Sequence, residues 1–97
     1  MIHGAWIVPN KGNRGEMIID TLTTDSKIEN MVIVCKKTTA VLASRCEFYN
    51  CSINAVSINT FHDCTFHNCW GSIGGQPLGA KRKLGNRCED LGMIEEL

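Results

Sequence analysis

Asparagine recurs along this chain at a nearly constant interval, each time two places after an apolar residue. The five segments are Val8-Pro9-Asn10, Ile28-Glu29-Asn30, Phe48-Tyr49-Asn50, Phe66-His67-Asn68 and Leu84-Gly85-Asn86. The intervals between successive asparagines are 20, 20, 18 and 18 residues. A fixed period of about twenty residues is typical of a solenoid, in which each repeat forms one coil stacked on the previous coil.

The repeat is clearest in the middle of the chain, where it predicts a strand followed by a corner. The segment Cys46–Cys51 aligns on Cys64–Cys69 with four identities in six positions. Cys46 and Phe48 alternate with more polar neighbours, which is the period-two pattern of a strand with one wet face. Asn50 then shifts the apolar positions by one residue, as expected at a corner, because asparagine tolerates the left-handed backbone conformation.

This register sorts the side chains of each coil into inward and outward columns. Further strands at 51–53 and near 56–58 would complete a triangular coil. The predicted inward positions are Trp6, Ser26, Cys46 and Cys64, then Val8, Ile28, Phe48, Phe66 and Leu84, and past the corner Met31, Cys51, Cys69, Ile33 and Ile53. The predicted outward positions are Pro9, Glu29, Tyr49, His67, Val32, Ser52 and Trp70. We expect the rings of Phe48 and Phe66 to stack, and residues 71–79 to form a loop that leaves the solenoid.

The stretch from Ile28 to Cys69 resembles the right-handed parallel β-helix found in phage tail proteins and in carbohydrate-active enzymes. The resemblance covers roughly residues 6–73 and rests on the motif apolar-x-Asn-apolar. It implies an all-β fold, a right-handed parallel β-helix of about four to five coils in a single domain, 1–97. Coils would occupy 1–73, and a loop with an irregular or short helical C-terminal cap would occupy 74–97. The pentapeptide-repeat family fits less well, because its five-residue period does not extend past one coil.

Charge balance and cysteine spacing narrow the class of protein. Lys plus Arg and Asp plus Glu number ten each, so no net field favours a long nucleic acid or an anionic membrane. No apolar run reaches the roughly 18 residues of a spanning helix, and no charged-then-apolar leader precedes Ala5, so we expect a cytoplasmic protein. Cys46, Cys51, Cys64 and Cys69 recur at the repeat period, which favours buried, reduced thiols over a disulfide framework.

Segment 62–69 supplies two histidines and two cysteines, the ligand types of tetrahedral zinc. On the predicted strand, however, His67 and Cys64 face opposite sides and Cys69 lies past the corner, so the spacing does not fit a metal site. No two carboxylates share a register for acid–base catalysis, which a β-helix lyase or hydrolase requires. We therefore expect no metal, no cofactor and no enzymatic activity.

Two basic segments and several aromatic residues are the candidates for ligand binding. Segments 10–15 and 83–87 both contain Gly-Asn-Arg beside lysine, so backbone amides and cations could meet on one phosphate. Neither segment has the spacing of a nucleoside-triphosphatase loop. Aromatic rings on the surface suit stacking against a base. The candidate ligand-binding residues are Trp6, Lys11, Asn13, Arg14, Tyr49, His67, Trp70, Lys83 and Arg87.

These observations favour a non-catalytic binding protein, such as a virus-encoded accessory or anti-defence protein, that sequesters a phosphate-bearing nucleotide. A solenoid this short exposes strand edges and core at its open ends, so we expect a homo-oligomer, a dimer or a trimer. Two alternatives stay open: a structural β-helix piece of a phage tail fibre or spike, and an inhibitor that binds a host protein. Free cysteines are a liability in an exposed particle, which disfavours the fibre.

Overall fold

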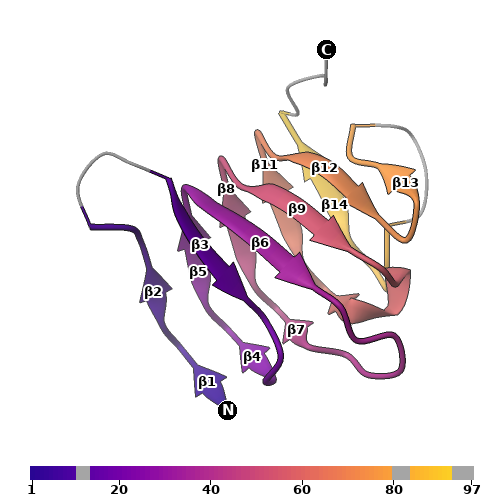
Figure 1. Ribbon diagram of the computed structural model, residues 1–97, viewed down its shortest axis with the longest axis horizontal. Coiled ribbons are helices and arrows are strands. Elements are labelled where there is room, and N and C mark those ends of the chain that lie inside the picture. The colour runs from indigo at the N-terminus through magenta and orange to yellow at the C-terminus, as the bar shows by residue number, and fades with distance from the viewer. Residues whose placement is uncertain (11–13, 80–83, 93–97) are drawn as a thin grey trace.

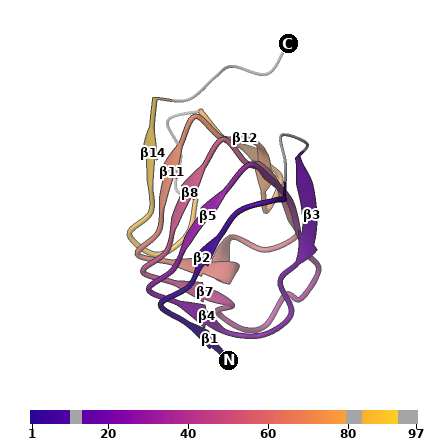
Figure 2. The same cartoon turned by 90° about the vertical axis from the view of Figure 1, so that its left-hand side faces the viewer.

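The computed structural model describes residues 1–10, 14–79 and 84–92 of the chain. Over these residues the chain winds into an all-β parallel solenoid of about four turns, with three sheets along the stack (Figure 1). Successive coils lie one behind another, so each coil adds a strand to each sheet (Figure 2). The all-β solenoid predicted from the asparagine period is confirmed.

Each full coil passes through sheet A, then sheet B, then sheet C. Sheet A contains β1 (Ile2–His3), β4 (Thr23–Thr24), β7 (Ala43–Ser44) and β10 (Phe61–His62). Sheet B contains β2 (Trp6–Ile7), β5 (Lys27–Glu29), β8 (Glu47–Tyr49), β11 (Thr65–His67) and β14 (Glu89–Leu91). Sheet C contains β3 (Gly15–Ile18), β6 (Met31–Cys35), β9 (Ser52–Ala55), β12 (Trp70–Ile73) and β13 (Gln76–Pro77). A short 3-10 helix, η1 (Ile58–Thr60), precedes β10.

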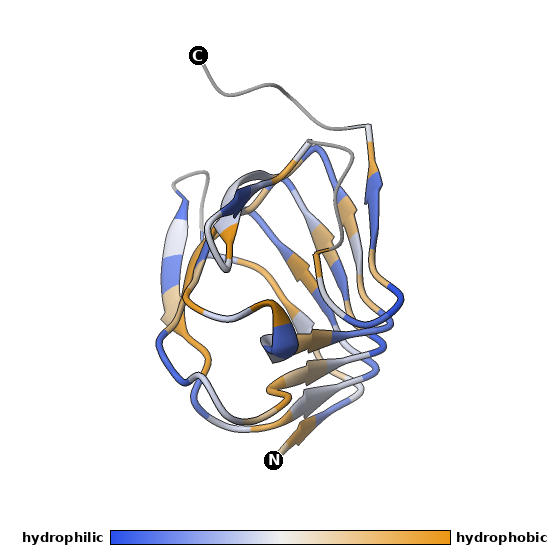
Figure 3. Cartoon of the chain, turned by 90° about the vertical axis from the view of Figure 1, so that its right-hand side faces the viewer, coloured by the Kyte–Doolittle hydropathy of each residue, from blue (hydrophilic) through white to orange (hydrophobic). Residues whose placement is uncertain are grey.

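The strand register builds the core. Within each sheet the neighbouring strands are parallel, except that β13 folds back antiparallel onto β12. Phe48 pairs with Ile28 on one side and with Phe66 on the other. Because alternate residues of a strand point to opposite faces, one column on each strand faces the interior. Figure 3 shows hydrophobic residues at matching places on neighbouring strands.

The predicted stack of phenyl rings is confirmed. The rings of Phe48 and Phe66 lie 5.1 Å apart at 12°, and both are buried. Phe61 from sheet A meets them edge-on, at 5.6 Å from Phe48 and 5.3 Å from Phe66. Aromatic pairs in these geometries contribute about 0.5–1.5 kcal/mol beyond their buried area. This three-ring cluster therefore holds sheets A and B together.

The asparagine corners are confirmed for three of the five segments. Asn30, Asn50 and Asn68 have φ of 56°, 54° and 53°, in the left-handed region that asparagine tolerates best after glycine. Gly92, with φ of 63°, follows Leu91 in the same register and ends the column. Asn86 is not a corner of this column, because it bridges to His62 in sheet A.

The predicted register of the first coil is wrong. Trp6 pairs with Lys27 and points outward with 69% of its surface exposed, and Val8 is 49% exposed. Ala5 and Ile7 occupy the inward positions that were predicted for Trp6 and Val8, because Ala5 matches Ser26 at a spacing of 21 residues and Ile7 pairs with Ile28. The segment between β2 and β3 is longer than the matching segment between β5 and β6. Counting back from Asn10 therefore shifts the predicted register of the first coil by one residue.

The last coil and the third strand also differ from the prediction. Strand β10 starts at Phe61, whereas the predicted strand near 56–58 overlaps the start of η1. Leu84 is buried, but Asp90 occupies the predicted position beside Phe66. The interval between these coils is 24 residues, as the Asp63–Arg87 pair shows, and not the 18 residues between Asn68 and Asn86.

The C-terminal end of the solenoid is covered. The predicted loop 71–79 instead contains the end of β12 and the short strand β13, joined by a turn at Gly74 and Gly75. Leu78 and Leu84 are buried beneath this end and close the core. No helix among the described residues has the length and apolar character needed to cross a membrane.

Candidate ligand-binding face

The outer face of sheet B carries two parallel rows of side chains. The strand register places one row through Trp6, Lys27, Glu47, Thr65 and Glu89. The second row runs through Glu29, Tyr49, His67 and Leu91. Because neighbouring parallel strands lie about 4.8 Å apart, rings and charges in one row meet directly. The face is therefore a ladder of aromatic and charged groups.

Tyr49 and His67 form the aromatic centre of this face. Their rings stack at 4.3 Å with an angle of 7° between the planes. The Tyr49 hydroxyl donates a hydrogen bond to Glu47 Oε1 at 2.5 Å. This hydrogen bond, with a smaller effect of burial, raises the pKa of Tyr49 above its ordinary value. The outward orientation predicted for both residues is confirmed.

Lys27 joins the two rows. Its ammonium lies 5.2 Å from the centre of the Trp6 ring and 5.0 Å from the centre of the Tyr49 ring. It also lies 3.8 Å from Glu29 Oε2, and Trp6 Nε1 donates a hydrogen bond to the same carboxylate. A cation within about 6 Å of an aromatic ring is attracted by the ring face. Lys27 therefore holds a positive charge between the exposed Trp6 ring and the half-buried Tyr49 ring.

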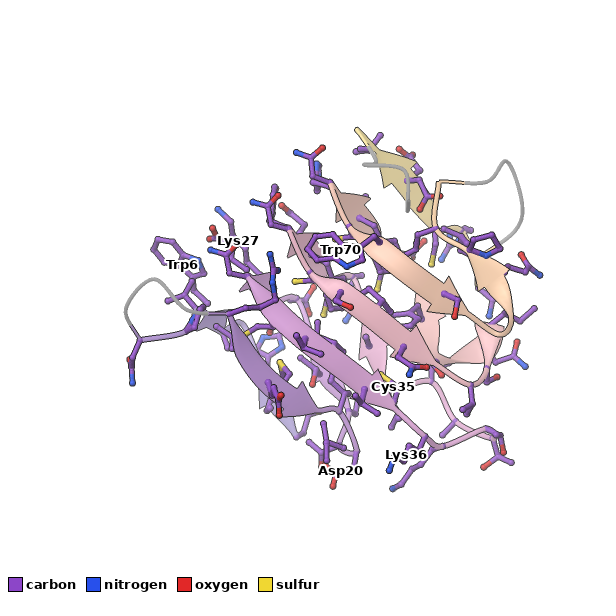
Figure 4. The ribbon with its side chains drawn as sticks, turned by 45° about the horizontal axis from the view of Figure 1, so that its top comes forward. Trp6, Asp20, Lys27, Cys35, Lys36 and Trp70 are labelled. Carbon is purple, nitrogen blue, oxygen red and sulfur yellow. The ribbon has the colours of Figure 1, made fainter. Side chains whose placement is uncertain are left out.

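Arg14 and Trp70 lie beyond the asparagine corner. The Arg14 guanidinium carbon is 4.5 Å from the centre of the Trp70 ring, and Nη1 donates a hydrogen bond to the Asn50 carbonyl. Trp70 begins β12 and points outward, as predicted, because it pairs with Ser52 on the outer column of sheet C. Figure 4 shows Trp6, Lys27 and Trp70 along one side of the solenoid.

We call this combined surface the aromatic–cationic strip. It comprises Trp6, Arg14, Lys27, Tyr49, His67 and Trp70. Both described cations of the strip rest on aromatic rings, which is an arrangement that binds planar and anionic groups. Glu29 and Glu47 lie in the same rows, so the charge of the strip is mixed.

Arg87 does not join the strip. It donates from Nη2 to Asp63 Oδ2 at 2.7 Å and lies 3.0 Å from His62 Nε2. This contact lies at the start of the sheet B strands, whereas Arg14 contacts Asn50 at their far end. Arg14 and Arg87, the arginines of the two Gly-Asn-Arg segments, are thus not brought together on one phosphate. The candidates Lys11, Asn13 and Lys83 lie outside the described residues.

A second column of left-handed residues explains the position of Arg87. Asp25, Arg45, Asp63 and Arg87 have φ of 53°, 54°, 53° and 56°, and their charges alternate along the stack. Arg45 contacts Asp25 through Nε at 2.8 Å and Nη2 at 3.1 Å. The hydrogen bond from Arg45 lowers the pKa of Asp25. Arg87 therefore pairs with an acid at the end of a charge ladder.

The histidines and cysteines of segment 62–69 point in different directions. Cys64 and Cys69 are buried, whereas His62 lies beside Asp63 and His67 stacks on Tyr49. Among the described residues, no group of three or more His, Cys, Asp or Glu is placed to hold a metal ion. Burial raises the pKa of the Cys35 thiol to about 12, and the hydrogen bond that the Cys64 thiol donates to Cys46 raises the pKa of Cys64. Such thiols are poor nucleophiles at neutral pH.

A groove of about 630 Å³ lies on the outer face of sheet C. Ile18, Val32 and Val34 form its apolar floor, with Glu16 and Lys36 at its sides. Sequence reasoning missed this apolar row on the outer face. The available signal was the unbroken apolar run Met31–Cys35. A strand with one wet face alternates apolar with polar residues, so a run without polar residues indicates that the outer face is apolar too.

Sequence reasoning also missed Lys27. It placed Glu29 and Glu47 outward but did not use them as partners of Trp6 and Tyr49. Lys27 alternates with the inward residues of its strand, so the same parity that placed Tyr49 would have placed it outward.

Comparison of the chain with protein-family models, with curated proteins and with solved structures gave no match. Its class is therefore defined by its own geometry. The protein is a short parallel β-solenoid with a covered C-terminal end and an aromatic–cationic strip on its outer surface. None of the three comparisons supports the resemblance to phage tail β-helices, so only the parallel β-solenoid itself is shown.

Proposed function

We propose that the protein is a non-catalytic binder of small phosphate-bearing nucleotides, and that the aromatic–cationic strip is the binding surface. The observation that carries this proposal is Lys27, whose ammonium lies between the exposed Trp6 ring and the Tyr49 ring. A base stacked on Trp6 would place its phosphate beside this ammonium.

The aromatic residues supply the stacking part of the interaction. Trp6 is 69% exposed, and the Tyr49–His67 pair continues the aromatic surface along the second row. Stacking of a base on an aromatic side chain contributes about 1–3 kcal/mol. Two bases of one ligand stacked on separate rings would reach a binding free energy typical of micromolar affinity, about −8 kcal/mol, once phosphate contacts are added.

The cations supply the phosphate contacts. Arg14 directs Nη1 at the Asn50 carbonyl, and the guanidinium group carries five N–H donors in total. Charge-assisted hydrogen bonds to phosphate are about twice as strong as neutral ones. Glu29 and Glu47 repel a phosphate. The strip therefore favours ligands that present the edges of their bases to these carboxylates and their phosphates to Lys27 or Arg14.

The biological role that follows is sequestration. The burial of five of the six cysteine side chains supports binding without turnover. A small binder of nucleotide signals in the cytoplasm would suit a virus-encoded accessory or anti-defence protein. This role is part of the proposal and follows from the ligand.

Isothermal titration calorimetry with cyclic dinucleotides, larger cyclic oligonucleotides and ADP-ribose derivatives tests the proposal. Trp6→Ala should raise the Kd of the bound ligand about 5- to 150-fold, as loss of one stacking contact predicts. Arg14→Ala should weaken binding, whereas Arg87→Ala is the matched control, because Arg87 pairs with Asp63 at the other end of the strands.

Each failure has a distinct meaning. Binding that survives Trp6→Ala and Lys27→Ala would place the site away from the strip. The absence of binding to every nucleotide tested would overturn the proposal and leave a host protein as the better partner for the exposed rings.

A further inference from the structure

The N-terminal end of the solenoid differs from the covered C-terminal end. Strands β1, β2 and β3 are the first in their sheets, and no strand of the described chain pairs with their outer edges. Among these strands β3 is the longest, with four residues, whereas β1 and β2 have two each. Unpaired strand edges attract another strand, and natural proteins usually protect them with lysine, proline or a bulge. Strand β3, Gly-Glu-Met-Ile, carries neither lysine nor proline.

The backbone of β3 presents a regular set of donors and acceptors to solvent. Gly15 N–H bonds to the Asn30 carbonyl, and Ile19 N–H bonds to the Val34 carbonyl, so odd-numbered residues face β6. In a parallel ladder the alternate residues direct both N–H and C=O to the other side. Glu16 and Ile18 therefore direct two N–H and two C=O groups away from the solenoid.

We propose that the free edge of β3 pairs antiparallel with β3 of a second copy, forming a two-fold dimer in which the two C sheets become one continuous sheet. This inference is independent of the proposed ligand. The partner is a second copy because the edge is complementary to itself under a two-fold rotation: the same two residues supply the donors and acceptors on both chains.

Hydrogen bonding and charge select one register. Pairing Glu16 with Ile18 of the partner uses all four outward groups of each chain and gives four hydrogen bonds, with Met17 facing Met17 of the partner at the centre. Pairing Glu16 with Glu16 of the partner would place two carboxylates opposite each other. Pairing Ile18 with its own copy would place Glu16 opposite Asp20 of the partner. Like charges directly opposite each other destabilise antiparallel pairs.

The side chains agree with this register. Cross-strand neighbours in an antiparallel pair share a face, so Ile18, which is 63% exposed, would lie on the outer face beside the partner's β3. The apolar groove floored by Ile18, Val32 and Val34 would then continue across the two-fold axis. On the inner face the partly buried Ile7 and Met17, which pack against the core, would be covered by the partner's first coil.

The two ends of the solenoid also explain why the assembly closes at two copies. Head-to-tail stacking would need a free parallel edge at the C-terminal end of sheet C. That end holds β13, which runs antiparallel and contains Pro77. Proline cannot donate a hydrogen bond to a further strand. A head-to-head dimer leaves no second β3 edge, so it does not extend into a filament.

Sedimentation velocity and native mass spectrometry of the full chain at micromolar concentration test the dimer. The expected result is a dimer for the unsubstituted protein. Ile18→Pro should give a monomer, because it removes one donor that faces the partner and leaves the hydrogen bonds to β6 in place. Far-ultraviolet circular dichroism and the urea midpoint establish that the variant remains folded.

A pair of matched substitutions at the same exposed position tests the register. Ile18→Lys would place lysine opposite Glu16 of the partner twice per dimer, and it should tighten the dimer about 2- to 30-fold. Ile18→Glu would place two carboxylates opposite each other twice, and it should weaken the dimer by a similar factor. If both substitutions weaken it equally, Ile18 faces its own copy and the proposed register is wrong. A monomeric or trimeric protein, or a dimer unaffected by Ile18→Pro, would overturn the proposal.

Discussion

Replacing Phe66 by alanine should remove a large part of the stability of this solenoid. Phe66 is fully buried, stacks on Phe48 at 5.1 Å and meets Phe61 edge-on at 5.3 Å. Truncation of a buried phenylalanine costs about 3–5 kcal/mol, and the two ring contacts place this site toward the upper part of that range. A chain of 97 residues is stabilised by about 5–15 kcal/mol in total. Phe66→Ala should therefore leave a marginally stable fold.

Urea denaturation followed by far-ultraviolet circular dichroism measures this loss. With an m-value of about 1–3 kcal/mol/M, a loss of about 4 kcal/mol lowers the unfolding midpoint by more than about 1 M. Tyr49→Ala is the matched control, because this substitution removes a ring of similar size from the outer face of the neighbouring strand. It should cost less than about 1.5 kcal/mol. A loss below about 1 kcal/mol for Phe66→Ala would refute the column of stacked rings.

Three further outcomes follow from the structure. Gly71→Ala should cost more than about 3 kcal/mol in urea denaturation, because Gly71 has φ of +107° and a Cβ there would lie 2.0 Å from the Ile53 carbonyl oxygen. Gly75→Ala is the control: Gly75 also has a positive φ, +79°, but open space for a Cβ, so this substitution should cost about 1–2 kcal/mol. Burial raises the pKa of Asp90 in the folded state, so the contribution of this residue to stability is lost as pH rises above the ordinary aspartate pKa. Asp90→Asn should therefore gain stability relative to the unsubstituted protein as pH rises through that region, and equal pH profiles would contradict this. Alkylation of the native protein at pH 8 should stop at one thiol, Cys88, because the other five are buried; mass spectrometry showing a second rapid label would disprove it.

The sequence predicted the middle of the fold better than its ends. The interval of 18 residues between Cys51 and Cys69 has no insertion, so alternation alone gave the inward Phe48 and Phe66 columns and the corners. Trp6 was placed inside because the strands of the first and second coils are 21 residues apart, and not the 20 residues between Asn10 and Asn30. A shift of one residue moves every side chain of a strand to the opposite face. Insertions in loops leave no mark on the apolar period, so their length cannot be counted from it.

The candidate site divides in the same way. The outward positions of Tyr49, His67 and Trp70 follow from strand parity, and these were predicted. The contact of Arg14 with Trp70 depends on how a long side chain beside an insertion crosses several coils, which no local pattern encodes. The pairing of Arg87 with Asp63 was hidden by the error in the last interval, which is 24 residues.

The hairpin β12–β13 gives this chain a distinctive folding order. Most other contacts between coils join residues 18 to 24 positions apart, as in Cys51–Cys69 and Asp63–Arg87, whereas Ser72 pairs with Pro77 across one tight turn. Closing a short loop costs less chain entropy than closing a long one, so this hairpin can form before any full coil exists. Coils would then add one at a time toward β1, as in other repeat proteins. Hydrogen exchange should therefore be slowest around β9 and β12 and fastest in β1 and β2, where each opening frees a single coil.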